Sequence, residues 1–442
     1  MDTARTPYGG VRCGGDRLRF RYHPRMRTDA AQTGTSTTTG DAMFAQARAL
    51  VQQGEHEQAF ARYVQAAEAG HAPSAIEAAR MALHGVGTAQ DVPRARAWLA
   101  AAEQADHPAA TYHLAWLGAG ATALPFDGAM QARLLTAANG GHLSAMLALA
   151  VYFGHKAAPE DQQRCVALLE QAAHAGHAVA AGLLAERLAR GEGTAPDPVA
   201  AAQLRAQLAA AGHPSLPDVP GDAGIAWPGA SGVLELADVL SVPAATQRAE
   251  APRVWTIDGL LSADECRLLI AHSLPQLKRS RAVDPRTGAP REVELRTSSD
   301  ATHDPMLEDV AIRLVQARMA AAAGVPLAHA ERLTVLRYLP GEQYRPHRDY
   351  LPPGSPETDR PESGNRLRTI CVYLNTVAAG GATAFPRAGL EIAPKAGRAV
   401  VFDNLHADGR PDPDSLHAGL PVEAGEKWLA TLWIRQRPYR SL

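Results

Sequence analysis

Two histidines and one carboxylate stand at a spacing that suits a metal ion. His347 and Asp349 are two residues apart, which places both side chains on one face of a β-strand. His417 follows 68 residues after Asp349, so it must come from another strand. Together they form the 2-His-1-carboxylate set that leaves positions open on non-haem iron(II). We therefore predict an iron(II) site at these three side chains.

Lys427, ten residues after His417, distinguishes two kinds of metal chemistry. A zinc hydrolase would need a general base near its metal-bound water. A lysine on the strand after the third ligand instead supplies a positive point charge, which suits the far carboxylate of a bidentate 2-oxo acid. Its register with His417 favours this second interpretation over a solvated surface lysine.

A second His-x-Asp pair, His406 and Asp408, shows that this pattern by itself does not locate a metal site. It lies in a stretch rich in Asp, Gly and Pro that also contains Asp412 and Asp414, which is the composition of turns rather than strands. We interpret these acidic residues as loop residues, not ligands.

Short β-patterned runs would position the metal ligands and Lys427. They cover residues 254–257, 333–339, 369–374, 399–402 and 428–434. Gly- and Pro-containing turns separate the later runs, which indicates a sandwich or barrel. Residues 266–274 and 306–323 have helical patterns, and the polar residues 278–303 between them are predicted to form a mobile loop over a site.

The N-terminal half repeats itself. A histidine closes each Ala-rich stretch, at successive spacings of 36, 35, 35 and 36, in the series His71, His107, His142, His177 and His213. This period predicts a solenoid of helical hairpins. The acidic residue 15 or 16 positions before each histidine would cap a helix. The histidines are interpreted as packing or capping residues, because five separate turns cannot converge on one ion.

These patterns divide the chain. We predict a disordered leader over residues 1–40, helical repeats over 41–214, a partly ordered linker over 215–252 and a β-rich domain over 253–442. Gly-x-Gly turns are predicted at residues 85–87, 118–120 and 191–193, whereas the unit around residues 153–160 lacks such a turn.

Composition narrows the class of protein. The formal net charge of −2 gives no electrostatic reason to expect nucleic acid or a membrane as partner. No signal peptide or membrane-spanning apolar run is apparent, and the four cysteines share no CxxC spacing. A soluble cytoplasmic protein is expected, with its oligomeric state left open.

Several motifs in the C-terminal half occur together and in order. They are YLPGEQYRPHRDY at 338–350, RTICVYLN at 368–375, GGATAFP at 380–386, SLHAGLPV at 415–422 and GEKW at 425–428. These motifs resemble the prolyl 4-hydroxylase family of Fe(II)/2-oxoglutarate dioxygenases, over roughly residues 254–437. The resemblance implies an α+β double-stranded β-helix of the jelly-roll or cupin-like kind. The N-terminal units similarly resemble Sel1-like repeats, relatives of tetratricopeptide repeats, which implies a surface for protein contacts.

The family resemblance also implies roles for individual residues. His347, Asp349 and His417 would bind Fe(2+), and Lys427 would pair with the distal carboxylate of 2-oxoglutarate. The co-substrate pocket would be lined by Tyr338, Thr369, Thr431 and Trp433. Arg296 and Tyr344 fall where the family contacts its substrate. The motif at residues 296–299 departs from the family in its continuation, Asp300-Ala301-Thr302, which bears on the substrate type.

The function expected on these grounds is hydroxylation of a protein or peptide, at proline, with O2 and 2-oxoglutarate as co-substrates and ascorbate as reductant. The repeats would then be a docking arm for the protein substrate. Two alternatives remain open: hydroxylation of a free amino acid or other small molecule, and a repeat scaffold without catalytic activity. The presence of all three ligands and Lys427 disfavours the scaffold.

Overall fold

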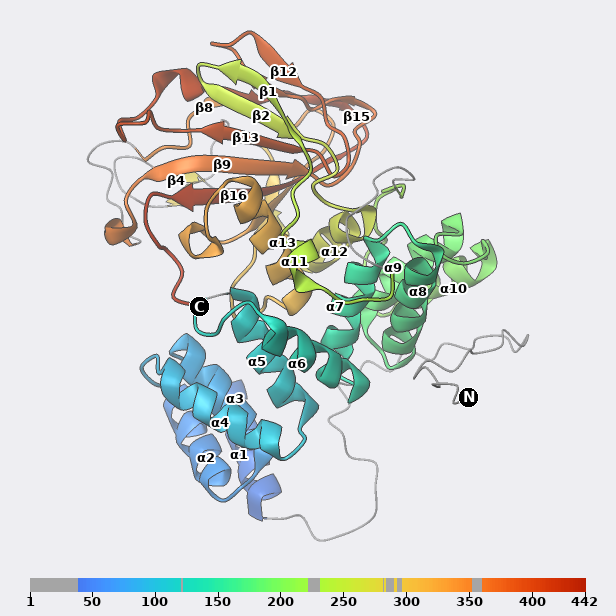
Figure 1. Ribbon diagram of the computed structural model, residues 1–442, viewed down its shortest axis with the longest axis vertical. Helices are drawn as coiled ribbons and strands as arrows, with labels where there is room; N and C mark the ends of the chain where they lie inside the picture. Colours follow the sequence, from blue (N-terminus) through green and yellow to red (C-terminus); the bar gives the residue numbers. More distant parts are fainter. Residues whose placement is uncertain are drawn as a thin grey trace, which may run out of the picture.

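The computed structural model describes residues 39–120, 122–221, 231–280, 282–283, 290–291, 296–351 and 360–442. The predicted leader, residues 1–40, therefore lies outside the described residues except for Thr39 and Gly40, which begin the first helix. Figure 1 shows two parts, a helical repeat domain (α1–α10) and a sheet domain that begins at β1.

The repeat domain is a series of helical hairpins, as the period predicts. Its helices are α1 (Thr39–Gln52), α2 (His56–Glu68), α3 (Ala72–His84), α4 (Val92–Gln104), α5 (Pro108–Gly120), α6 (Gly128–Asn139), α7 (Leu143–Gly154), α8 (Pro159–His174), α9 (Ala178–Arg190) and α10 (Pro198–Ala210). No described helix is by itself long and apolar enough to cross a membrane; α6 and α7 pass that test only as a pair bent by 116°.

The repeated histidines and aspartates cap these helices. The imidazoles of His71, His142 and His177 each accept a hydrogen bond from a backbone N–H in the first turn of α3, α7 and α9. The carboxylates of Asp127 and Asp197 do the same for α6 and α10. These caps satisfy backbone donors that a helix leaves free. The capping prediction is wrong at Glu55, whose side chain makes no cap hydrogen bond, and at Asp161, which lies inside α8 rather than before it.

The turn predicted at residues 118–120 is wrong, because α5 continues to Gly120. The glycines allow close packing there instead. A Cβ on Gly118 would lie 2.8 Å from the Met130 side chain, and a Cβ on Gly120 would lie 2.5 Å from the guanidinium of Arg313 in the sheet domain. The glycine pair thus lets α5 approach both its hairpin partner and the other domain.

The sheet domain contains two larger sheets and two short strand pairs. The main sheet has the order β1 (Ala245–Glu250), β2 (Arg253–Ile257), β13 (Ala399–Asp403), β9 (Arg366–Tyr373), β16 (Lys427–Arg435), β7 (Thr334–Tyr338), β6 (Ser299–Thr302), β3 (Lys278–Arg279). The smaller sheet has the order β12 (Leu390–Ile392), β11 (Thr383–Phe385), β14 (His417–Gly419), β8 (Tyr344–His347). Two further pairs join β4 (Ala282–Val283) to β5 (Pro290–Arg291) and β10 (Ala379–Gly380) to β15 (Val422–Ala424). Side chains of both sheets share one core, including Tyr373, Phe385 and Phe402, so the sheets face each other as in a jelly roll.

Two sequence boundaries need correction. The predicted linker, residues 215–252, contains α11 (Leu236–Val239) and β1, and β1 pairs with β2 along its whole length. The sheet domain therefore starts by Ala245 rather than at residue 253. Residues 278–303 are not simply a loop, since β3 and β6 extend the main sheet beyond β7. Within this stretch, residues 281, 284–289 and 292–295 lie outside the described residues.

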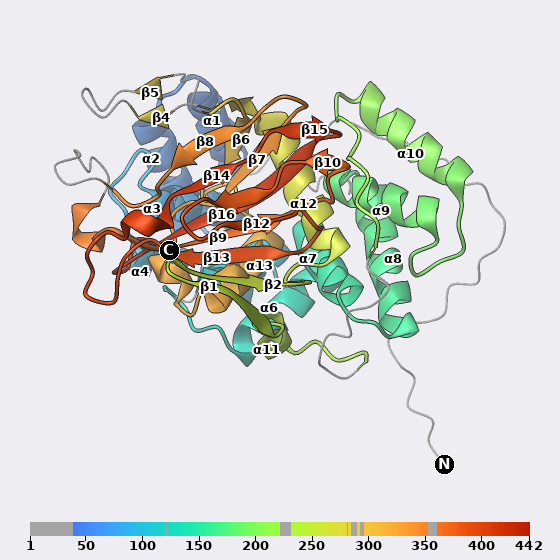
Figure 2. The ribbon, with the colours of Figure 1, turned by 90° about the horizontal axis from the view of Figure 1, so that it is seen from above.

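Helices α12 (Ala263–Ser273) and α13 (Val310–Ala322) lie between the main sheet and the repeat domain (Figure 1). Helices α5 and α7 pack on α13, and α7 and α9 pack on α12. One apolar core runs through both domains and includes Trp116, Leu149, Leu268 and Ile312. Seen from above, α8, α9 and α10 extend beyond the sheet domain on one side (Figure 2). Three of the helices that follow repeat histidines, α5, α7 and α9, are therefore partly covered by the sheet domain.

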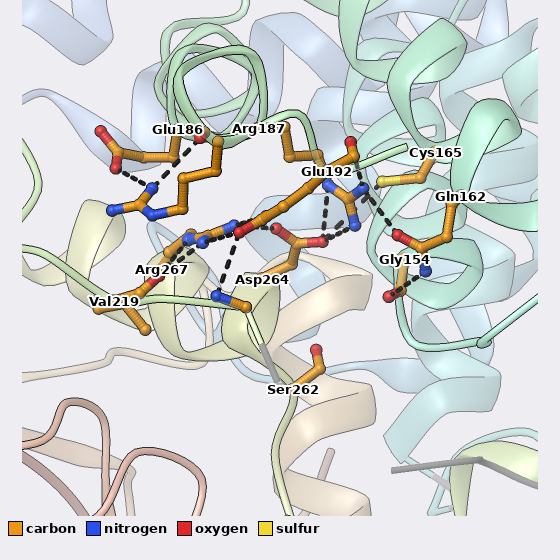
Figure 3. A network of polar contacts seen from close by, with 12 residues as sticks. Gly154, Gln162, Cys165, Glu186, Arg187, Glu192, Val219, Ser262, Asp264 and Arg267 are labelled. Carbon is orange, nitrogen blue, oxygen red and sulfur yellow. Dashed lines mark hydrogen bonds and ion pairs between the residues drawn. The ribbon is translucent and has the colours of Figure 1, made fainter. Parts of the chain in front are cut away.

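Buried ion pairs cross this interface. Asp264 on α12 accepts hydrogen bonds from Arg187 on α9 and from Arg267 at 3.0 Å, and Arg267 also pairs with Glu192 at 2.5 Å (Figure 3). The unit that lacks the glycine turn supplies His155, whose ring lies 3.0 Å from the carboxylate of Glu265. The connecting turn of that unit thus belongs to the interface.

Candidate metal centre

The three predicted metal ligands meet at the edge of the smaller sheet. His347 is the last residue of β8, His417 is the first of β14, and the two are paired across the strands. Asp349 lies just after β8 rather than on it, which corrects the predicted strand position. One oxygen of Asp349 is 3.6 Å from Nε2 of His347 and the other is 3.7 Å from Nε2 of His417. One donor atom from each residue lies within 4.8 Å of the others, which suits a single ion.

Hydrogen bonds to Nδ1 leave Nε2 of both histidines available to a metal. Nδ1 of His347 lies 2.9 Å from the carbonyl oxygen of Arg345, and Nδ1 of His417 lies 2.9 Å from that of Ser415. A carbonyl only accepts, so each Nδ1 carries the proton and each Nε2 keeps its lone pair for a metal.

Electrostatics favour the same protonation state. Burial lowers the pKa of His347 to about 3, with a further contribution from His417, so its ring is neutral. Burial alone would raise the pKa of Asp349, but the two histidines, Arg366 and the Thr369 hydroxyl outweigh burial and lower it to about 2. Two imidazole nitrogens and one carboxylate are the donor set of a divalent transition metal.

The competing pair at His406 and Asp408 lies on a turn. Asp408 accepts hydrogen bonds from the backbone and the guanidinium of Arg410, and the His406 side chain is 45% exposed. This confirms that the acidic residues there are loop residues. Asp412 accepts a hydrogen bond from the backbone N–H of Asp414, at the start of the 3-10 turn before His417.

A cavity of about 40 Å³ opens beside the metal ligands, and Lys427 forms part of its wall. Lys427 is only 1% exposed, and its ammonium lies 5.1 Å and 5.3 Å from the ring centres of Tyr338 and Tyr373. Burial lowers its pKa to about 8, opposed only by Cys371; no acidic side chain among the described residues adds to it. A buried cation without an acidic partner beside a metal site fits an anionic ligand.

Three of the four residues predicted to line a co-substrate pocket do line this cavity: Tyr338, Thr431 and Trp433. Thr369 does not. It is fully buried behind Asp349, and its hydroxyl donates a 2.8 Å hydrogen bond to that carboxylate. Thr369 therefore contacts a metal ligand rather than the cavity.

Sequence reasoning missed the apolar wall of the cavity, which includes Leu336, Leu429 and Cys371. Strand periodicity could have found it, because side chains two residues apart share a face. Leu336 precedes Tyr338 by two residues on β7, and Leu429 lies between Lys427 and Thr431 on β16. Cys371 lies 3.5 Å from the Thr431 hydroxyl, and burial raises its pKa to about 12.

Arg296 and Tyr344 both reach the cavity. The Tyr344 ring stacks on His347 with centres 3.4 Å apart, and the Arg296 guanidinium lies 5.4 Å from the Tyr344 ring centre. Asp300, where the sequence departs from the family motif, lies 3.8 Å from the Arg296 guanidinium. The two predicted substrate residues thus form one wall beside the metal ligands.

Several known proteins are similar to parts of this chain. Residues 333–435 match a family model described as the 2OG-Fe(II) oxygenase superfamily. The chain is 34% identical over 208 residues to the probable prolyl 4-hydroxylase 3 of Arabidopsis thaliana, covering 43% of this chain and 71% of that protein. A viral collagen prolyl hydroxylase from Paramecium bursaria Chlorella virus-1, solved with 2OG, is 30% identical over 41% of this chain and 95% of its own, with a TM-score of 0.33. A Sel1 repeat protein from Oxalobacter formigenes is 23% identical over 39% of this chain and 74% of its own, with a TM-score of 0.36.

Proposed function

Because this chain belongs to the prolyl 4-hydroxylase family of 2OG-Fe(II) oxygenases, we propose that it hydroxylates proline residues of a protein or peptide. It is a dioxygenase that depends on Fe(2+) and 2-oxoglutarate and consumes O2. The observation that carries the proposal is the meeting of His347, Asp349 and His417 beside a buried lysine that has no acidic partner among the described residues. Ascorbate as a reductant is part of the proposal.

The residues of the centre fit the iron and the co-substrate. His347, Asp349 and His417 would hold Fe(2+) through two imidazole nitrogens and a carboxylate, and Lys427 would hold the far carboxylate of 2-oxoglutarate. When bound, iron(II) with 2-oxoglutarate supplies the oxidising chemistry that turns O2 and a C–H bond into an alcohol, succinate and CO2.

The protein itself orients the reactants and excludes water. Leu336 and Leu429 give the cavity an apolar wall, so the ion pair with Lys427 would form in a medium of low dielectric constant. The hydroxyls of Tyr338 and Thr431 would offer directional hydrogen bonds to the bound 2-oxoglutarate. Arg296 and Tyr344, which stand over His347, are placed to contact the substrate.

A docking role for the repeats is part of the proposal, but only for the surface that the sheet domain leaves uncovered. Since α5, α7 and α9 already pack on the sheet domain, that part of the repeat surface is not free for a partner. A cleft of about 250 Å³ remains where the two domains meet, and its wall includes His84, Gln90, Asp304, Arg332, Arg360 and Arg440. Arg440 is buried and pairs with Glu308 at 3.6 Å, whereas Arg332 is exposed and pairs with Asp304 at 3.5 Å. An acidic segment of a polypeptide substrate would compete with Asp304 for Arg332.

The proposed function is tested by coupling turnover to product. Purified protein with Fe(2+), 2-oxoglutarate and a panel of proline-containing peptides should release succinate above the peptide-free rate, and mass spectrometry should place one added oxygen on proline. His347→Ala should abolish both signals. Stimulation by free amino acids but by no peptide would instead establish the small-molecule alternative. The cytoplasmic location stays a prediction.

A charge change in the cleft tests the docking proposal separately. Arg332→Gln should raise the KM for an acidic protein substrate, by roughly 10-fold if one interfacial charge pair is lost. Peptide-free turnover of 2-oxoglutarate should not change, because Arg332 does not line the metal cavity. Arg94→Gln, a comparably exposed arginine in the repeats, is the matched control. Equal effects of the two variants would contradict a docking role for the cleft.

A further inference from the structure

A short hydrogen-bonded chain lies behind the metal ligand Asp349. The Thr369 hydroxyl donates to Oδ2 of Asp349 over 2.8 Å, and it lies 2.9 Å from the side-chain amide nitrogen of Asn404. Thr369 and Asn404 are both fully buried. Neither Thr369 nor Asn404 lines the cavity, so both act on the metal ligand Asp349 and not on the co-substrate.

The direction of these hydrogen bonds follows from the number of protons. A hydroxyl has one proton, and the ionised carboxylate of Asp349 can only accept it. The Thr369 oxygen must therefore accept its second hydrogen bond, and the NH2 group of Asn404 is the donor. An aspartate at position 404 could not fill this role, because its carboxylate would compete with Asp349 for the same proton.

The backbone of Asn404 leads to a second metal ligand. Its carbonyl oxygen accepts a hydrogen bond from the N–H of Asp412 over 3.0 Å. The carbonyl of Asp412 accepts a 2.7 Å hydrogen bond from the hydroxyl of Ser415, and the carbonyl of Ser415 accepts one from Nδ1 of His417 over 2.9 Å. Asn404 is itself tied to the start of β9 by a 2.9 Å hydrogen bond from its N–H to the carbonyl of Leu367.

We infer that Asn404 is a positioning residue whose side chain orients the metal ligand Asp349 through Thr369, while its backbone ties the loop that leads to His417 to β9. With the donor removed, the Thr369 hydroxyl can rotate away from Asp349 and the carboxylate loses its fixed orientation. The metal must then organise the site itself, and its affinity falls. This inference rests on the iron site of the enzyme but not on the identity of its substrate.

The test is the affinity of the protein for Co2+ or Mn2+, measured by titration calorimetry without co-substrate. Asn404→Asp and Thr369→Val should each weaken binding by roughly 10- to 100-fold, the usual effect of losing a partner behind a metal ligand. Thr369→Ser, which keeps the hydroxyl, should bind within about threefold of wild type. The double variant should be no weaker than Thr369→Val, because both changes remove one shared interaction.

Asn375→Asp is the matched control. Asn375 is also a buried asparagine of the main-sheet region, but its side chain bonds the backbone of Glu426 and Trp428 instead of a ligand. It should lower thermal stability and keep the metal affinity. If Asn404→Asp binds metal as wild type does, or if the two substitutions add fully in the double variant, Asn404 has no positioning role. Thr369→Val, close in shape to threonine, keeps the test decisive should Asn404→Asp fail to fold.

Discussion

Lys427→Met is expected to raise the KM for 2-oxoglutarate about 100-fold while leaving the affinity for the metal unchanged. Losing one partner of a buried charge pair costs about 3 kcal/mol, and each 1.4 kcal/mol corresponds to tenfold. Lys427 is buried, and Cys371 is the only described residue that raises its pKa. No acidic side chain of the described residues balances its charge, so the carboxylate of the bound co-substrate would do so. Initial rates of succinate release at varied 2-oxoglutarate measure the effect.

The same substitution should not destabilise the protein when 2-oxoglutarate is absent. A buried ammonium without a carboxylate partner carries a desolvation cost, and methionine fills a similar volume without that cost. We expect the thermal midpoint of Lys427→Met to equal or exceed that of wild type in the metal-free protein. A KM within threefold of wild type would contradict the assignment, and a lower thermal midpoint would contradict the argument from burial.

The lowered pKa of Lys427 also predicts the direction of a pH effect. Its pKa is about 8 in the folded protein, below the ordinary value of 10.5, so the folded state loses this proton first as pH rises. The anionic co-substrate binds the protonated form, and the KM for 2-oxoglutarate should therefore rise above about pH 8. Between pH 8 and 10.5 this group adds to stability with rising pH, because only the unfolded chain still holds the proton. Lys427→Met should show neither dependence.

Asp264→Ala is expected to lower the free energy of unfolding by about 3–5 kcal/mol, because it leaves the buried guanidinium of Arg187 without its carboxylate. Asp264 joins Arg187 of the repeat domain to Arg267 of the sheet domain, and all three side chains are buried (Figure 3). Burial would raise the pKa of Asp264, but these two arginines outweigh burial and lower it. Its contribution is therefore present near neutral pH and is lost as pH falls through the folded pKa.

The matched control is Asp258→Ala. Asp258 also pairs with two cations, Arg398 at 2.6 Å and Lys395 at 3.5 Å, but its side chain is 49% exposed. An exposed pair contributes at most about 1 kcal/mol, so this variant should unfold close to wild type in a urea titration. Because one apolar core runs through both domains, wild type should unfold in a single transition. Two separate transitions, or equal losses in the two variants, would show that the interface is not a shared core.

Much of the sheet domain follows from the sequence. The patterns for residues 254–257, 333–339, 369–374, 399–402 and 428–434 correspond to β2, β7, β9, β13 and β16 within a few residues. The short strands β3 and β6 were missed, because two to four residues are too few for a period to be visible. The capping histidines of the repeats were predictable, since caps depend only on neighbouring backbone.

The ligand residues could be selected from the sequence because metal chemistry restricts both residue type and spacing. Their surroundings could not. Whether Thr369 faces the cavity or Asp349 depends on where residues after β8 run, and these lie outside the regular strand. The link from Asn404 to Thr369 joins residues 35 positions apart and becomes visible only once β13 is paired with β9.

The sequence by itself thus determined the chemistry of the centre and the helical-hairpin nature of the repeats, because both depend on local spacing. Only the tertiary structure decided how the two halves relate. The sequence predicts that the repeats form a docking arm, yet α5, α7 and α9 share a core with α12 and α13. Contacts between residues more than a hundred positions apart, such as Trp116 with the carbonyl of Glu308, leave no periodic signal in either segment. Burial of complementary surfaces, which no local pattern encodes, joins the two domains.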